Sequence, residues 1–198
     1  MTIFTFLVGL AGAIVAARGG YLPTLLGAVL MQCNSILDGC DGELARVRFQ
    51  HSRTGQWLDT IGDDSTNVCF AVSLALGARS LPHGAALMSA AGWVVAATTL
   101  IAAALYYAEL HGIGSGDLNA LEWGFDKAPA QHGLGRLLHW GHYLLKQDFQ
   151  LFLFMVLALC GVLHYALPLY AAGGLITVAA VSGRRLGAWR RKRRALAK

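Results

Sequence analysis

The chain has 198 residues, of which 56% are hydrophobic and only 14% charged, and its formal net charge is +5. Soluble domains of this length are usually about 45–50% apolar and about 25% charged. This composition argues against a soluble globule and favours a bundle of membrane helices.

The apolar residues gather in blocks separated by polar connections. A helix that crosses the roughly 30 Å hydrocarbon core of a bilayer needs about 20 residues, and several blocks reach or approach this length. We therefore expect an all-α integral membrane bundle of six transmembrane helices, forming one domain over residues 1–198. In chain order the helices are predicted at 3–17, 22–47, 55–78, 84–109, 148–165 and 167–187. In the long connection after the fourth helix, residues 134–145 suggest an amphipathic segment in the membrane interface, with a plain loop as the alternative.

Basic residues are distributed unevenly between the two sides of this bundle. Of the sixteen Lys and Arg residues, Arg18 and Arg79 fall on one predicted side and all the others on the opposite side. The positive-inside rule places the richer side in the cytoplasm, together with both ends of the chain. The basic tail Gly183–Lys198 follows a membrane block, so we expect it to contact anionic lipid rather than nucleic acid. A multi-pass protein of a bacterial or archaeal inner membrane is the predicted setting.

Four aspartates lie where the second and third predicted helices end on the cytoplasmic side. An ionised aspartate inside a membrane helix costs about 2.5–3.5 kcal/mol, so packing alone gives no reason to carry four. They are Asp38, Asp41, Asp59 and Asp63. Residues three or four apart share a helix face, and an antiparallel hairpin would bring the two faces together. Oxygen ligands with room for phosphate predict Mg²⁺ or Mn²⁺.

The spacing of these aspartates matches a known signature. Asp38-x2-Asp41-Gly42-x2-Ala45-Arg46-x8-Gly55-x3-Asp59-x3-Asp63 resembles, at all eight fixed positions, that of the CDP-alcohol phosphatidyltransferases. The local sequence LDGCDGELAR, followed by SRTGQWLD, looks most like that of the di-myo-inositol phosphate phosphate synthase type. The resemblance implies transfer of a phosphoalcohol group from a CDP-alcohol donor to the hydroxyl of an alcohol acceptor, with release of CMP.

The resemblance also implies residue roles. Asp38, Asp41 and Asp59 would hold divalent metal, and Asp63 would contribute to the metal site and act as the catalytic base. Gly42, Ala45, Arg46 and Gly55 would form the CDP-binding site. Lys146 is the candidate to bind a phosphorylated acceptor, with an interfacial lysine as the alternative. The family implies a homodimer.

Other interpretations stay open at this point. One is a phospholipid synthase that uses CDP-diacylglycerol. A different class would be a non-catalytic bundle whose aspartates pair with arginines, or a bundle that transports a cation. The chain also begins almost inside its first predicted span, so the N-terminal interfacial helix usual in the family is expected to be missing.

Overall fold

The computed structural model describes residues 2–47, 53–113 and 147–196, and within these ranges the chain is entirely helical apart from short turns. The all-α prediction is therefore confirmed for this part of the chain. The helices are α1 (Thr2–Ala16), α2 (Tyr21–Val47), α3 (Arg53–Gly77), the short 3₁₀ helix η1 (Ala78–Ser80), α4 (Ala85–Ile113), α6 (Gln147–Leu159) and α7 (Leu163–Leu196).

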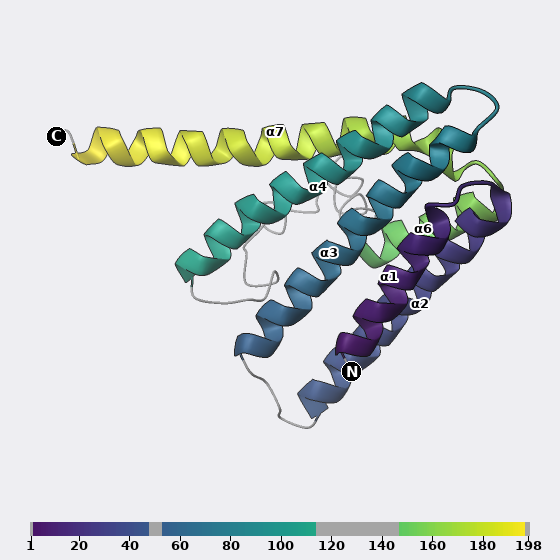
Figure 1. Ribbon diagram of the computed structural model, residues 1–198. Helices are drawn as coiled ribbons and strands as arrows, with labels where there is room; N and C mark the ends of the chain where they lie inside the picture. The colour runs from purple at the N-terminus through teal and green to yellow at the C-terminus, as the bar shows by residue number, and fades with distance from the viewer. Residues whose placement is uncertain (1, 48–52, 114–146, 197–198) are drawn as a thin grey trace, which may run out of the picture.

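The helices pack side by side in an order that differs from their order in the chain (Figure 1). Helix α1 lies between α2 and α3, α3 packs against α4, and α4 packs against α7. On the other side α2 packs against α6, which connects directly to α7. As a result, α2 and α3 face each other across α1, and the signature segments on these two helices lie at the same end of the bundle.

Glycine allows the first two helices to approach very closely. A Cβ atom at Gly27 would lie 2.6 Å from the Cβ of Ala16 and 2.7 Å from the carbonyl oxygen of Gly12. No ordinary side chain fits into that space. Small residues at such crossings are typical of helix packing inside membranes, where close backbone approach replaces the hydrophobic driving force.

The end of the bundle opposite the signature is joined by hydrogen bonds between its connections. The amide of Gly20 donates to the Ser80 hydroxyl at 3.1 Å, and the Tyr21 hydroxyl donates to the carbonyl of Leu159 at 3.0 Å. Gly19 has a φ of 70°, which a residue with a side chain rarely adopts. A Cβ at Gly19 would also collide with Gly77 and Ser80.

Aromatic side chains fill the interior between three helices. The ring of Phe154 on α6 lies 6.2 Å from Phe70 on α3 and 4.5 Å from Tyr170 on α7, measured between ring centroids. Phe70, Met31, Leu74 and Leu167 are almost completely buried around this contact. These residues form the hydrophobic core and hold α3, α6 and α7 at fixed distances from one another.

The predicted boundary between the last two helices is wrong. We expected the fifth helix to end at residue 165, whereas α6 ends at Leu159 and α7 begins at Leu163. Gly161, with a φ of 73°, makes the turn. Pro168 lies inside α7, where it has no N–H to donate to the carbonyl four residues earlier. Helix α7 also continues to Leu196, well past the predicted end at 187.

Two helices of the described part are long and apolar enough to cross a membrane: Ala85–His111 in α4 and Leu163–Gly183 in α7. The segments Ile3–Ala16 and Asp148–Leu159 are apolar but shorter. Helices α2 and α3 have the length, but each carries acidic residues toward one end. These findings weakly indicate membrane association. The predicted interfacial segment at 134–145 lies outside the described residues.

Candidate active site

A polar pocket opens between α1, α2 and α3 at the end of the bundle that carries the signature. It has a volume of about 180 Å³, which includes its open mouth. Three of the four signature aspartates contribute to it, together with neutral polar side chains. The lining residues are Thr5, Phe6, Asn34, Asp38, Asp59, Gly62, Asp63 and Thr66.

Helical spacing explains why these residues share one pocket. Asn34 and Asp38 are four apart on α2, and Asp59 and Asp63 are four apart on α3, so each pair lies on one helix face. Helix α1 approaches closely enough to complete the wall because it carries Gly9 at the crossing. A Cβ at Gly9 would lie 2.8 Å from the Thr66 side chain and 3.2 Å from that of Asn34.

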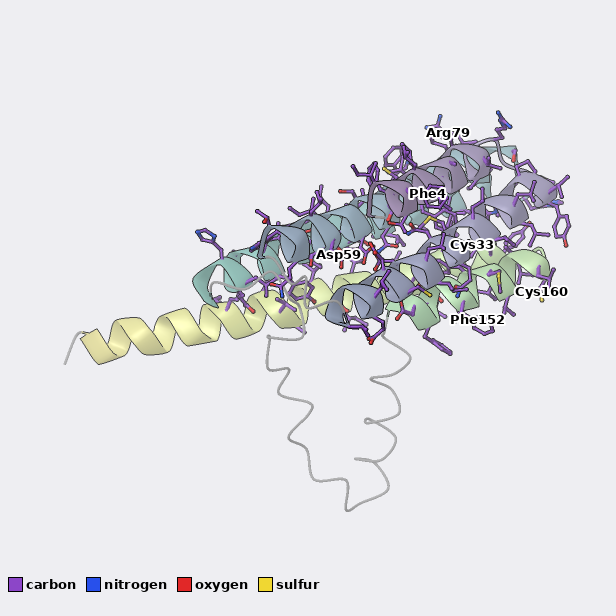
Figure 2. The ribbon with its side chains drawn as sticks, turned by 90° about the horizontal axis from the view of Figure 1, so that it is seen from below. Phe4, Cys33, Asp59, Arg79, Phe152 and Cys160 are labelled. Carbon is purple, nitrogen blue, oxygen red and sulfur yellow. The ribbon has the colours of Figure 1, made fainter. Side chains whose placement is uncertain are left out.

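The carboxyl groups of the two facing helices meet across the pocket. Asp38 on α2 and Asp59 on α3 are within hydrogen-bonding distance of each other, and both interact electrostatically with Asp63. In Figure 2, Asp59 lies between the helices, among oxygen atoms near the centre of the view. The hairpin geometry expected from the sequence is thus present for these three residues. Asp41 is outside the pocket lining but interacts electrostatically with Asp38 and Asp59.

This donor set is suited to a hard divalent cation. Its ligand atoms are all oxygens, as Mg²⁺ and Mn²⁺ prefer, and a cation would relieve the repulsion between carboxylates that face each other. Among the described residues, no three His, Cys, Asp or Glu side chains already stand in a metal-holding arrangement. The all-oxygen donor set fits such a cation by its chemistry, and the metal role of the aspartates stays a prediction.

The residues predicted to bind the CDP group are at the ends of α2 and α3, next to the pocket. Gly42 and Gly55 are both exposed, and a Cβ added at Gly42 would meet nothing within 4 Å. Ala45 and Arg46 belong to the last turn of α2, but their side chains are outside the described part of the structure. Lys146 also lies outside the described residues, so its predicted acceptor contact stays a prediction.

A second polar contact links α3 to α4 beside the pocket. The Tyr107 hydroxyl donates a 2.6 Å hydrogen bond to Oδ2 of Asp64. The Tyr107 ring also packs edge-on against Trp57, with 5.8 Å between ring centroids. Asp64 follows Asp63 directly and points to α4 instead of into the pocket. This contact fixes the rotation of α3 about its axis, and with it the face that carries Asp59 and Asp63.

Sequence reasoning missed a fifth carboxylate near the pocket. Asp148, in the first turn of α6, accepts a 2.9 Å hydrogen bond from the Ser35 hydroxyl on α2. It also interacts electrostatically with Asp38 and Asp63. The signal available in the sequence was an acidic residue at a helix N-terminus, a position that the helix dipole favours. That signal says nothing about the partner helix.

The fold and the pocket define a class of protein: a helical bundle, with two helices long and apolar enough to cross a membrane, that carries an aspartate-lined pocket at one end. Comparison with known families is more specific. The CDP-alcohol phosphatidyltransferase family matches residues 1–182. The chain therefore belongs to the CDP-alcohol phosphatidyltransferase family.

Individual relatives match only part of the chain. A protein of Aquifex aeolicus named bifunctional IPC transferase and DIPP synthase is 41% identical over 76 residues, which are 38% of this chain and 17% of the relative. Proteins with the same name from Thermococcus kodakarensis and Rubrobacter xylanophilus are 39% identical over 82 residues and 37% identical over 101 residues. These matches cover 41% and 51% of this chain but only 18% and 21% of the relatives. The chain thus matches about a fifth of the length of these relatives.

Proposed function

We propose that the protein transfers a phosphoalcohol group from a CDP-alcohol to a hydroxyl of a second alcohol and releases CMP. The observation that carries this proposal is the meeting of the signature aspartates of α2 and α3 at one pocket. Family membership gives the reaction class.

In this proposal the aspartates have two roles, cation binding and proton transfer. Asp38, Asp41 and Asp59 hold the divalent cation, Mg²⁺ or Mn²⁺, and Asp63 contributes to the same site. The cation, when bound, neutralises the charge of the donor pyrophosphate. Asp63 takes the proton from the acceptor hydroxyl. The acceptor oxygen then forms a bond to the β-phosphorus, while the bond between this phosphorus and the CMP oxygen breaks and CMP leaves. Asp63 suits this role because it lines the pocket one helical turn beyond Asp59.

In this proposal the reacting phosphate and hydroxyl groups meet at the aspartate-lined pocket, and the nucleoside lies outside it. The open space at Gly42 and the exposed end at Gly55 provide a surface beside the pocket where the cytidine can lie against the helix backbone.

We further propose that the bundle crosses the membrane six times with the pocket end in the cytoplasm. Successive described helices alternate in direction, so α1 begins and α2 ends at the pocket end of the bundle. Large apolar side chains on the outer surface suit contact with lipid. Leu169 and Ile176 on α7, for example, are 76% and 70% exposed. The uneven distribution of Lys and Arg supports the orientation. A homodimer in the membrane is also part of this proposal.

For the substrates we propose a water-soluble pair, CDP-inositol as donor and an inositol phosphate as acceptor. The relatives from Aquifex aeolicus and Archaeoglobus fulgidus are both named bifunctional IPC transferase and DIPP synthase. This name agrees with the type that the local sequence around the signature resembles. The pair requires recognition of a polar group on both substrates, and Lys146 is the residue we propose for the acceptor phosphate.

The test is a CMP-release assay on the purified protein. We expect CMP from labelled CDP-inositol with inositol phosphate, with the label remaining in the aqueous phase after extraction. The Asp59→Asn variant is the matched control for non-enzymatic hydrolysis. If CDP-inositol is inert and label from CDP-diacylglycerol enters the organic phase, the soluble substrate pair is refuted and phospholipid synthesis is supported instead. Cation uptake into vesicles without CMP release from any CDP-alcohol would refute the enzymatic proposal.

A further inference from the structure

Helix α6 brings a carboxylate to the pocket end that the family signature does not contain. Asp148 lies in the first turn of α6, and α6 packs against α2. The Ser35 hydroxyl donates a 2.9 Å hydrogen bond to Oδ1 of Asp148. Ser35 is adjacent to Asn34 and one turn before Asp38, and both of those residues line the pocket. The hydrogen bond therefore fixes the Asp148 carboxylate beside the wall of the pocket.

The charge of Asp148 acts on the aspartates of the pocket itself. Asp148 interacts electrostatically with Asp38 on α2 and with Asp63 on α3. Asp148 is exposed, and its hydrogen bond with the Ser35 hydroxyl holds its carboxyl group beside the pocket wall. A third helix therefore adds a carboxyl group next to the site where the proposed cation binds.

We propose that Asp148 is a positioning residue for the divalent cation, and that its charge strengthens cation binding by Asp38 and Asp63 without replacing either as a ligand. This inference rests on the proposed function only in requiring that the aspartates hold a cation. In the absence of a cation Asp148 repels its neighbours, and with a cation bound it is attracted to it. Its effect on the stability of the protein should therefore change sign when the cation binds.

The two parts of the contact can be separated by two substitutions. Asp148→Asn removes the charge but keeps a side chain of the same shape, whose oxygen still accepts the Ser35 hydrogen bond. Ser35→Ala removes the hydrogen bond but keeps the charge. If the role of Asp148 were only to fasten α6 to α2, Ser35→Ala would be the more damaging change.

The experiment measures Mn²⁺ binding to the purified full chain in detergent, using the electron paramagnetic resonance signal of free Mn²⁺. Because Asp148 is exposed and its charge is screened by water, we expect Asp148→Asn to raise the Kd by about 3- to 10-fold. Ser35→Ala should raise it by less than about 2-fold, since a hydrogen bond without a change in charge alters the field only slightly. Thermal unfolding without divalent cation gives the second readout. Without divalent cation, Asp148→Asn should have a Tm at least as high as that of the wild type. Added Mn²⁺ should raise the Tm of the variant by less than it raises the Tm of the wild type.

Three results would overturn the proposal: an unchanged Mn²⁺ affinity in Asp148→Asn, an equal or larger loss in Ser35→Ala, or a wild-type protein without saturable Mn²⁺ binding. The CMP-release assay separates this inference from the proposed function. A wild type that binds Mn²⁺ more tightly than Asp148→Asn but releases no CMP supports the inference and refutes the function. If the wild type releases CMP but Asp148→Asn binds Mn²⁺ as tightly as the wild type, the function is supported and the inference is refuted.

Discussion

The hydrogen bond between Tyr107 and Asp64 gives a prediction whose magnitude can be worked out from the structure. Tyr107→Phe removes the hydroxyl and keeps the ring, so the edge contact with Trp57 remains. The bond that is lost measures 2.6 Å and ends on a carboxylate. Hydrogen bonds to charged groups contribute about 1.5–3 kcal/mol in soluble proteins. Side-chain hydrogen bonds between membrane helices average about 0.6 and reach about 1.7 kcal/mol.

Both side chains are only partly buried, so water can replace some of the lost bond. We therefore expect Tyr107→Phe to lower the free energy of unfolding by about 1–2 kcal/mol. For a chain of this size each kcal/mol corresponds to about 2–4 °C in Tm, which gives a decrease of roughly 2–8 °C. Thermal unfolding of the purified protein in detergent measures this shift. Because the bond also fixes the rotation of α3, kcat for CMP release should fall together with the stability.

The matched control is Tyr165→Phe on α7, where the ring is 46% exposed. It makes the same chemical change at a position where no hydrogen bond from the hydroxyl is recorded among the described residues. Equal Tm values for the two variants would refute the reasoning. A further check is the combination of Tyr107→Phe with Asp64→Asn. If the two residues act through one bond, the double variant should lose less stability than the sum of the two single changes.

Four further predictions follow from the site and the packing. Asp63→Asn should lower kcat by about 10²–10⁴-fold, the usual loss for a general base, while keeping most of the donor affinity; full activity would remove Asp63 from the proposed role. Asp38→Ala should abolish Mg²⁺-dependent binding of the CDP donor in calorimetric titration, and retained binding would exclude Asp38 as a ligand. Gly92→Ala should lower the free energy of unfolding by about 1–3 kcal/mol through overpacking, because its Cβ would lie 2.7 Å from the Cα of Ala75. The control is Gly173→Ala, where an added Cβ would meet nothing within 4 Å. Equal Tm values for the two variants would contradict the packing argument. Single cysteines at positions 50 and 196, in a variant without the native cysteines, should resist an impermeant reagent in intact cells, and labelling at either position would refute the proposed orientation.

The sequence predicted the parts of the site that depend on local helical geometry. Spacings of four place Asp59 and Asp63 on one face of α3, and an antiparallel arrangement of α2 and α3 brings that face toward Asp38. Both follow from the periodicity of a helix and from the signature. The length and apolar character of the blocks likewise predicted the helices themselves, with errors mainly at their ends.

Contacts between distant segments were outside the reach of this reasoning. Ser35 and Asp148 are 113 positions apart, and Asp64 and Tyr107 are 43 apart. Neither pair leaves a periodic signal, because each depends on which helices become neighbours. The end of α6 was misplaced for a different reason. The apolar run continues through residues 159–163, so hydropathy gives no sign of the turn that Gly161 makes with its positive φ.

The hydrogen bonds between distant segments hold the two aspartate-bearing helices at more than one point along their length. Away from the pocket, Gly20 is bonded to Ser80 and Tyr21 to Leu159. Nearer the pocket, Ser35 on α2 is bonded to Asp148 and Asp64 on α3 to Tyr107. The backbone that carries the aspartates is therefore positioned before any ligand arrives, so little binding energy has to be spent on ordering it.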